Sequence, residues 1–580
     1  MSPLTSLKTW GTRYTGRFVL GALMLAVTNA LGYVIPKLLK HAIDSLSTAV
    51  DTSLLGTIAL AVFLIACVQA GVRIASRLLI FNAARDVERD LRQALFAHIL
   101  RWSPERLRSH ALGDLQSRML NDLTNVRLIF GVGLLNIVNT ALVYAIAMPL
   151  MFSESTTLAL FALIPYPIMI VMMLLIAKRI FSQSKIASER NSELSNLINE
   201  DLGARLFITA TGLQRSQQAR FAERNDRYLE TNVRLVMTRA LMFPVVGMLG
   251  SLGVAITLYV GGKGVIAGEL TLGSLVAFTA YLGLLTFPTL MFGFMLAVLQ
   301  RGRASWKRIA DLFAEPTWQA GERTLELRAP PTLALAHATI ARGEETLISG
   351  LSLTIAPGER VGIVGEVGSG KSTLLAILAR LLDAPAPATY AIDGADVRTL
   401  TLDNVRSFIG YVPQQPFLFS TTVRENVCLG RPDSDDLTVE RALDMAAVRA
   451  DVARLPQGLA TEIGERGVTL SGGQKQRLAI ARALVIDPKV LLLDDCFSAV
   501  DAETERQIIE ALLAEDRRRT LVIATHRLAV LDHVDRILVL DKGRIVEEGP
   551  PEKLQQPGTR YYELHRKQRL AERVHAKASA

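Results

Sequence analysis

The sequence predicts a two-domain chain in which six membrane-spanning α-helices precede an α/β domain built on a parallel sheet. Two observations lead to this prediction. Six apolar stretches, each near the 17–25 residues that a helix needs to cross a bilayer, lie before residue 300. After about residue 330, short apolar runs alternate with helical segments. The length of 580 residues accommodates both domains.

Composition narrows the class of protein. Half of the residues are hydrophobic, mean hydropathy is +0.29 and 21% are charged, which is more apolar than a typical soluble domain. Residues 1–315 carry 31 basic and 19 acidic residues, against 33 and 36 in the rest. The net charge of +9 therefore belongs to the half with the apolar stretches and does not indicate nucleic-acid binding. Cys67, Cys428 and Cys496 are too few for a disulfide framework and form no CxxC zinc motif.

The six apolar stretches are expected to cross a lipid bilayer. They lie at about 18–39, 54–80, 129–152, 157–180, 241–262 and 273–299. Arginine-rich segments follow the second and fourth stretches, whereas the alternate loops are short and poor in basic residues. Because basic loops stay in the cytoplasm, we expect both long loops and both termini there, in a multi-pass protein of the inner (plasma) membrane.

The two basic segments are too regular to be loose linkers. Apolar residues recur at helical spacing from Asn82 to Leu100 and from Ser182 to Leu206, which indicates that spanning helices continue into the cytoplasm. The pattern breaks at Ser103-Pro104 and at Thr211-Gly212. We expect short crosswise helices at these two tips.

A phosphate-binding loop follows the apolar run Arg360–Val364. Its residues match GxxxxGK[ST] between a strand and a helix, and they are Gly365, Glu366, Val367, Gly368, Ser369, Gly370, Lys371, Ser372 and Thr373. In this motif backbone N–H groups at a helix N-terminus surround the phosphates of a nucleotide. Lys371 is expected to reach the terminal phosphates, and Ser372 to ligate Mg²⁺.

Two further apolar runs end in residues suited to phosphate chemistry. Val490–Leu493 leads into Asp494 and Asp495, and the run Thr520–Ala524 ends shortly before His526. Ligands of parallel α/β sheets bind at the carboxyl ends of the strands, so Asp494 is expected to hold Mg²⁺, usually through water. Asp495 is placed to polarise the attacking water. His526 is placed to contact the γ-phosphate or that water.

The run Leu470-Ser471-Gly472-Gly473-Gln474 is the most specific motif, and with it the chain resembles an ATP-binding cassette (ABC) exporter of the half-transporter type. The other motifs occur in family order: the Q-loop around Gln414, the segment Thr461–Gly467, and the D-loop Ser498–Asp501. In the membrane half, Gly113–Asp122 and Gly268–Gly273 are similar to family segments. The resemblance covers nearly the whole chain and implies that the second domain is an α/β P-loop nucleotide-binding domain of ABC type.

The resemblance also implies a domain division and a mechanism. The division places a membrane domain at 1–315, a linker at 316–330, an ATP-binding domain at 331–566 and a basic tail at 567–580. Two cassettes would pair head to tail around ATP and Mg²⁺, so that Ser471, Gly472, Gly473 and Gln474 serve the opposite chain's site. Gln414 would act both as a metal ligand and as a catalytic residue. Short helices near 103–108 and 208–213 would dock on the cassettes and relay their closure, which switches access from inside to outside.

Two departures from the family pattern concern this chain's own phosphate loop. Fully active members carry Glu where this chain has Asp495. Aspartate is one methylene shorter, and about 1 Å of misplacement can cost on the order of 10²-fold in rate. The adenine-stacking aromatic residue is missing from Thr339–Glu344, where the Arg342 guanidinium could stack instead. We therefore expect a degenerate ATP site in a heterodimer, whose partner has Glu after its strand aspartate and a weakened signature.

These observations favour ATP-driven export of amphipathic or hydrophobic compounds, drugs or lipids, across a bacterial inner membrane. The alternatives are a peptide or toxin exporter and a homodimeric exporter that hydrolyses ATP weakly at Asp495. An ATP-gated channel would need a regulatory insertion, which the sequence does not show. Six spans exclude a soluble cassette ATPase acting on DNA or ribosomes. The expected partners are a second half-transporter, the lipid bilayer and a small amphipathic substrate.

Overall fold

The computed structural model describes residues 6–48, 52–318, 321–343, 345–464, 470–514 and 517–567. The chain forms two compact units. The first comprises Met1–Arg101 and His110–Pro316, and the second comprises Trp102–Ser109 and Thr317–Ala580. Helix α4 (Pro104–Arg108) therefore belongs to the second unit, although it lies in sequence between helices of the first.

The first unit is helical, and in the described residues six helical segments are long and apolar enough to cross a membrane, as predicted. These segments are Thr15–Leu46, Ser53–Ile99, Leu112–Glu154, Thr156–Gly203, Gln214–Ile266 and Leu272–Ala314. Their helices, with the short α1, are α1 (Leu7–Thr12), α2 (Thr15–Thr48), α3 (Thr52–Ile99), α5 (Leu112–Ser117), α6 (Leu123–Leu128), α7 (Leu134–Glu154), α8 (Thr156–Leu163), α9 (Pro165–Gly203), α10 (Arg205–Thr211), α11 (Gln214–Ala240), α12 (Met242–Ile266) and α13 (Leu272–Ala314). Two π turns, Arg118–Asp122 and Ile129–Gly133, interrupt the third segment.

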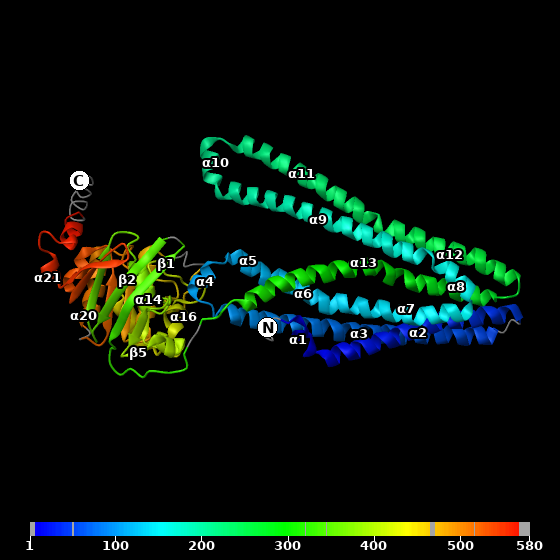
Figure 1. The fold of residues 1–580 in the computed structure, drawn as a ribbon, viewed down its shortest axis with the longest axis horizontal. Helices are drawn as coiled ribbons and strands as arrows, with labels where there is room; N and C mark the ends of the chain where they lie inside the picture. The colour runs from blue at the N-terminus through cyan, green and yellow to red at the C-terminus, as the bar shows by residue number, and fades with distance from the viewer. Residues whose placement is uncertain are drawn as a thin grey trace. The chain divides into compact units, whose positions relative to one another are not determined.

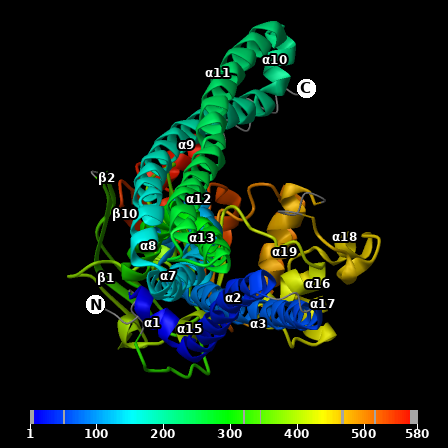
Figure 2. The same cartoon turned by 90° about the vertical axis from the view of Figure 1, so that its right-hand side faces the viewer.

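The spanning helices continue well beyond bilayer length, as the periodicity predicts. Helix α3 runs unbroken through the expected extension, and α9 does so as far as Gly203. Helices α9 and α11 lie side by side and splay away from α2 and α3 (Figures 1 and 2). The short helix α10 joins their ends and stops at Gly212, which has a φ of +70° that favours glycine. Helix α4 begins at Pro104, and Ser103 caps it by accepting a hydrogen bond from the Arg106 N–H.

Helix α13 lies at the centre of the first unit. It packs against α2, α7, α9 and α12, and its buried residues include Phe278, Tyr281 and Leu285. Several polar side chains between these helices are hydrogen-bonded. Tyr166 on α9, for example, donates to the Leu282 carbonyl at 2.6 Å.

Polar side chains join three helices of this unit at one end, where α7 ends and α13 begins. Glu154 on α7 accepts from Lys40 Nζ at 2.6 Å and from Ser274 Oγ at 3.0 Å. Asp44 on α2 accepts from the Gly273 N–H at 2.9 Å. We call these five residues the polar clasp. Because Lys40 and Glu154 are only 23% and 17% exposed, their mutual contact compensates for lost hydration.

The second unit is α/β. Its strands are β1 (Leu333–Arg342), β2 (Glu345–Ile355), β3 (Arg360–Gly365), β4 (Thr389–Ile392), β5 (Ala395–Asp396), β6 (Ile409–Val412), β7 (Val490–Asp494), β8 (Thr520–Ala524), β9 (Arg536–Asp541) and β10 (Arg544–Gly549). Besides α4, its α-helices are α14 (Lys371–Leu378), α15 (Leu402–Ser407), α16 (Val423–Val427), α17 (Asp436–Met445), α18 (Arg449–Ala453), α19 (Gly472–Val485), α20 (Ala502–Ala514) and α21 (Pro551–Leu554).

Two sheets organise this unit. One sheet has the order β10-β9-β3-β8-β7-β6, parallel except for the β10–β9 pair, and the other is the antiparallel sheet β2-β1-β4-β5. Every residue of β7 and β8 is buried, as expected for central strands covered on both faces. Together with the six spans, these sheets confirm the predicted fold class.

The polar clasp generates a stability prediction. A Cβ added at Gly273 would meet the Lys40 carbonyl oxygen and lie 2.5 Å from Asp44 Oδ1, so α13 would have to move away from α2. We expect Gly273→Ala to lower the free energy of unfolding by about 1–3 kcal/mol, as overpacking does. The measurement is the thermal unfolding midpoint of the purified protein in mild detergent.

Gly283→Ala is the matched control. It lies on the same helix, and its added Cβ would meet nothing within 4 Å. Equal unfolding midpoints for the two variants would contradict the proposed role of close packing at the clasp.

Candidate nucleotide-binding site

Strand pairing brings the candidate residues to one edge of the parallel sheet. Asp494 at the end of β7 pairs with Ala524 at the end of β8, and Ala524 also pairs with Ile363 of β3. On the other side of β7, Leu493 pairs with Val412, the last residue of β6. The phosphate loop, the strand aspartate, the Q-loop and the residue before His526 therefore all leave the sheet at the same edge.

The phosphate loop forms a cradle between β3 and α14. Gly368 and Gly370 have φ values of +83° and +102°. Residues that carry a Cβ rarely adopt this backbone conformation. Lys371 is 7% exposed, and its Nζ donates to the carbonyls of Gly365 and Glu366 at 2.9 Å each. Desolvation by burial lowers the pKa of Lys371. Its ammonium thus points back into the loop, where it can transfer its hydrogen bonds to a phosphate.

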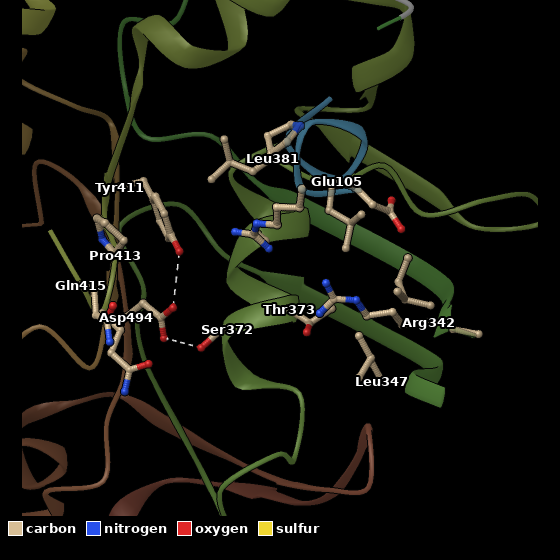
Figure 3. A pocket seen from close by; sticks show the side chains of 17 residues that line it. Glu105, Arg342, Leu347, Ser372, Thr373, Leu381, Tyr411, Pro413, Gln415 and Asp494 are labelled. Atoms are coloured by element: carbon tan, nitrogen blue, oxygen red, sulfur yellow. Dashed lines mark hydrogen bonds between the residues drawn. The ribbon is translucent and has the colours of Figure 1, made fainter. Parts of the chain in front are cut away.

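Asp494 connects the loop to the sheet. It accepts from Ser372 Oγ at 2.9 Å and from the Tyr411 hydroxyl at 3.3 Å (Figure 3). Burial raises the pKa of Asp494, and the neighbouring Asp495 carboxylate adds to this effect. A cation beside Asp494 would relieve the burial of its charge. Hard oxygen donors on a hydroxyl and a carboxylate, with room for phosphate and water, fit Mg²⁺.

Asp495 turns away from the strand and meets the Q-loop. Its φ is +44°, and its N–H donates to the Ala524 carbonyl at 2.8 Å. The side-chain amide of Gln414 donates to Asp495 Oδ2 at 3.3 Å. The structure therefore brings together Gln414, Asp494 and Asp495, which are three of the predicted site residues.

His526 lines a neighbouring hollow with Gly365, Glu366 and Val367, at the start of the phosphate loop. Desolvation lowers the pKa of His526, and the nearby Lys371 ammonium lowers it further. The imidazole is therefore neutral near pH 7 and can either donate or accept a hydrogen bond there.

The nucleotide hollow, of about 440 Å³, is the space lined by Ser372, Thr373, Tyr411, Asp494 and Arg342, among others. Figure 3 shows Arg342 beside Thr373, across the hollow from Tyr411. Tyr411 is the only aromatic residue in the described lining, and its hydroxyl is bonded to Asp494. Among the described residues, the Arg342 side of the lining thus has no aromatic ring. Glu344, the last residue of the segment Thr339–Glu344, lies outside the described residues.

Helix α4 also lines the nucleotide hollow, through Pro104, Glu105 and Arg108. Figure 3 shows Glu105 on the same side of the hollow as Arg342. A short segment between two membrane helices thus contributes one carboxylate and one guanidinium to the hollow.

The signature residues stand at the start of α19 and are not in the lining of the nucleotide hollow. Ser471 is the N-cap, in a capping box with Gln474. A Cβ at Gly473 would lie 2.7 Å from the Ala499 carbonyl oxygen, so glycine allows the D-loop to approach closely. Gln476 stabilises the same contact. Its side-chain amide donates a hydrogen bond to Ser498 Oγ at 2.8 Å and accepts one from the Ala499 N–H at 2.9 Å.

Comparisons with known proteins agree with this arrangement. The family description "ABC transporter transmembrane region" matches residues 18–289, and "ABC transporter" matches residues 348–498. The chain is 34% identical to the probable multidrug resistance ABC transporter ATP-binding/permease protein YheI of Bacillus subtilis, over 96% of each chain. The chain belongs to the ABC transporter family.

Further relatives extend over the same length. The multidrug resistance-like ATP-binding protein MdlA of Escherichia coli is 35% identical, over 97% of this ABC transporter and 96% of its own length. A solved structure titled "Structure of a bacterial Atm1-family ABC exporter with ATP bound" superposes with a TM-score of 0.81, at 27% identity, over 95% of this chain and 99% of that one.

Several motif residues of this ABC transporter lie at one edge of the parallel sheet. The phosphate loop, Gln414, Asp494, Asp495 and His526 follow four adjacent parallel strands, whereas the signature lies elsewhere in the cassette. Helix α4 lies in the cassette unit, whereas α10, at the second expected docking segment, lies in the first unit. The segment Thr461–Gly467 is only partly covered, because residues 465–469 lie outside the described part of the chain.

Sequence reasoning did not assign Tyr411, Glu105 and Arg108 to this site. Tyr411 could have been assigned from the sequence, because it lies two residues before Pro413 in the same run as the Q-loop residue Gln414. The resemblance predicts that the helix near 103–108 docks on a cassette, but it does not indicate that Glu105 and Arg108 line this hollow, which the fold brings together with the distant phosphate loop.

The Arg342 side of the hollow generates a binding prediction. We expect Arg342→Tyr to tighten ATP binding by on the order of tenfold, because stacking of a base on an aromatic ring contributes about 1–3 kcal/mol. The measurement is equilibrium titration of the purified complex with a fluorescent ATP analogue. Arg342→Leu removes the guanidinium without adding a ring and serves as control. Equal affinities of the Tyr and Leu variants would show that the base does not bind beside residue 342.

Proposed function

We propose that this chain is one half of a heterodimeric exporter that moves amphipathic or hydrophobic compounds, drugs or lipids, across the inner membrane of a bacterium. Its family membership makes it a multi-pass membrane protein and an ATPase coupled to transport. The names of its relatives in Bacillus subtilis and Escherichia coli refer to multidrug resistance, which supports the substrate class. A peptide or toxin exporter remains the alternative for the cargo.

The proposal of a dimer rests on the separation of the signature residues from the nucleotide hollow. Ser471, Gly472, Gly473 and Gln474 are not in its lining, so one chain does not surround a nucleotide with both motifs. In the proposed complex each nucleotide lies between the phosphate loop of one chain and the signature of the other. ATP then holds the cassettes together, and its hydrolysis releases them.

In the proposed site each residue has a distinct role. Lys371 and the loop N–H groups bind the phosphates, while Ser372 and Asp494, with Gln414, hold Mg²⁺ directly or through water. Mg²⁺ would neutralise charge on the phosphate oxygens. Asp495 polarises the attacking water, and His526 contacts the γ-phosphate.

A degenerate site is proposed because of Asp495. The Asp495 side chain is short, and its carboxylate accepts a hydrogen bond from Gln414 at 3.3 Å. Both features keep the carboxylate close to the Q-loop, so it extends less far than a glutamate would toward a water beyond the γ-phosphate. The chain's own signature is complete, so the partner's phosphate loop would form the hydrolytic site. A homodimer that uses Asp495 twice is the alternative.

We further propose that the membrane domain ends near residue 315, that a linker covers 316–330 and that the ATP-binding domain covers 331–566, with both termini in the cytoplasm. The basic loops of the sequence support this orientation. Most of the tail proposed at 567–580 lies outside the described residues.

The decisive experiment is to identify the native complex. The chain would be affinity-tagged in its own membranes, extracted in mild detergent, and its stoichiometric partner identified by mass. We expect a different half-transporter with Asp-Glu at the end of its strand. Two copies of this chain alone would overturn both the heterodimer and the degenerate site.

Substitution of Asp495 tests the degenerate site in the assembled complex. We expect Asp495→Glu to raise ATP hydrolysis only modestly, far less than the roughly 10²-fold that repositioning a general base by about 1 Å can produce. Asp495→Asn should leave most transport intact. The matched control removes the partner's corresponding acid, which should abolish transport. An equal collapse of transport in both variants would contradict the proposal.

A further inference from the structure

The nucleotide hollow has two ends with different chemistry. At one end Ser372 donates to Asp494 at 2.9 Å, next to the N-terminus of α14, which favours anions. The other end is lined by Arg342 and Leu347 from β1 and β2 and by Glu105 from α4, and Figure 3 shows these three side chains across the hollow from Asp494. Because the phosphates of a nucleotide occupy the first end, its base lies toward the second.

Glu105 presents a carboxylate without a partner at the base end. Its backbone is held in α4, where its carbonyl accepts from the Ser109 N–H at 3.1 Å. Its side chain is exposed, and no described residue donates a hydrogen bond to its carboxylate or forms an ion pair with it. An ionised carboxylate only accepts hydrogen bonds. A base that meets Glu105 must therefore supply the donors.

The two common purines differ in the donors that they can supply. Guanine presents its N1–H and its amino group side by side, so that each can donate to one carboxylate oxygen. Adenine presents its amino group beside N1, which carries no proton and is itself an acceptor. A carboxylate therefore forms two hydrogen bonds with guanine, whereas with adenine it forms one and faces a second acceptor.

The cost of placing a carboxylate near a triphosphate is offset by two cations. Arg108 and Arg342 line the same hollow. Burial raises the pKa of the Tyr411 hydroxyl and the Arg108 guanidinium acts in the opposite direction, so this cation lies near Tyr411. On the Arg342 side the described lining has no aromatic ring. Recognition of the base there depends on its edge more than on stacking.

We propose that Glu105 selects guanine, so that this chain's own nucleotide hollow binds GTP at least as tightly as ATP. Each carboxylate oxygen accepts one hydrogen bond, from N1–H and from the amino group. The inference rests on the nucleotide site of the proposed function and names the base that this site selects. Glu105 acts as a specificity residue and takes no part in hydrolysis.

Competitive photolabelling of the purified complex tests the inference. The probe is radioactive 8-azido-ATP with Mg²⁺ on ice, and the tagged chain is separated from its partner on a gel, so that labelling of this chain is read alone. The competitors are GTP, ATP and ITP, which keeps N1–H but lacks the amino group. We expect GTP to displace the probe at the lowest concentration, followed by ITP and then ATP. This order tests the inference without any variant.

The variant Glu105→Gln tests the residue itself. Its amide both donates and accepts, which suits adenine as well as guanine. We expect the preference for GTP over ATP to fall by about tenfold, because a bidentate contact discriminates between bases to about this extent. The ratio of the two affinities is the readout, since the lost charge acts equally on the triphosphate of both nucleotides.

Glu345→Gln is the matched control. Glu345 pairs with Arg342 across β1 and β2, is exposed and is not in the lining of the hollow, so the ratio should stay unchanged. An equal fall in this variant would show that charge at a distance, not contact, sets the preference.

Two outcomes would overturn the inference and leave the proposed function intact. One is tighter binding of ATP than of GTP to the intact complex, and the other is an unchanged ratio in Glu105→Gln. Failure of 8-azido-ATP to label this chain at all would refute the proposed nucleotide site together with the inference.

Discussion

Parallel pairing of β7 with β8, and of β8 with β3, is the constraint on which the nucleotide site depends. It places Asp494 level with Ala524 and Ala524 level with Ile363. A slip of one residue would move Asp494 along the sheet by about 3.3 Å. This exceeds what the hydrogen bond between Ser372 and Asp494, at 2.9 Å, can tolerate. The buried strands β7 and β8 therefore position the residues at their ends, and the contact between Ser372 and Asp494 depends on their register.

The sequence predicts those parts of the fold that are encoded locally. Six apolar stretches, the helical spacing beyond Asn82 and the phosphate loop each lie within a single stretch of chain, and each is found as predicted. The order of the strands in the sheet is not encoded locally, because it depends on which strands pair across long loops. The prediction that Asp494 holds Mg²⁺ thus needed a general rule about sheet edges, not the local pattern.

Other parts of the site could not be predicted because they depend on long-range placement. The resemblance predicts a docking helix near 103–108, but not that Glu105 and Arg108 line the nucleotide hollow. They reach it because α4 packs with the cassette unit. A cavity lined in part by Arg239 and Arg301 likewise combines residues from four helices, α9, α11, α12 and α13. Periodicity assigns a residue to a face of its own helix, but it does not say which other face lies opposite.

Helix α4 gives the nucleotide hollow a direct covalent link to a membrane helix. Only Leu100–Ser103 separate the end of α3 from Pro104, and Pro104, Glu105 and Arg108 line the same hollow as Ser372 and Asp494. A linker this short transmits displacement with little slack, since four residues span at most about 14 Å when fully extended. A change in the hollow that moves α4 must therefore pull on α3, or be resisted by it.

The polar clasp has a consequence for hydration. Lys40, Asp44 and Glu154 find their hydrogen-bond partners within the protein, so water need not solvate them in the present arrangement. If α2, α7 and α13 were to separate at this end, each charge would lose those partners at once, and an unpaired charge in an apolar setting is very costly. Any separated state must therefore be wet at that end, with water molecules replacing Ser274 and the Gly273 N–H.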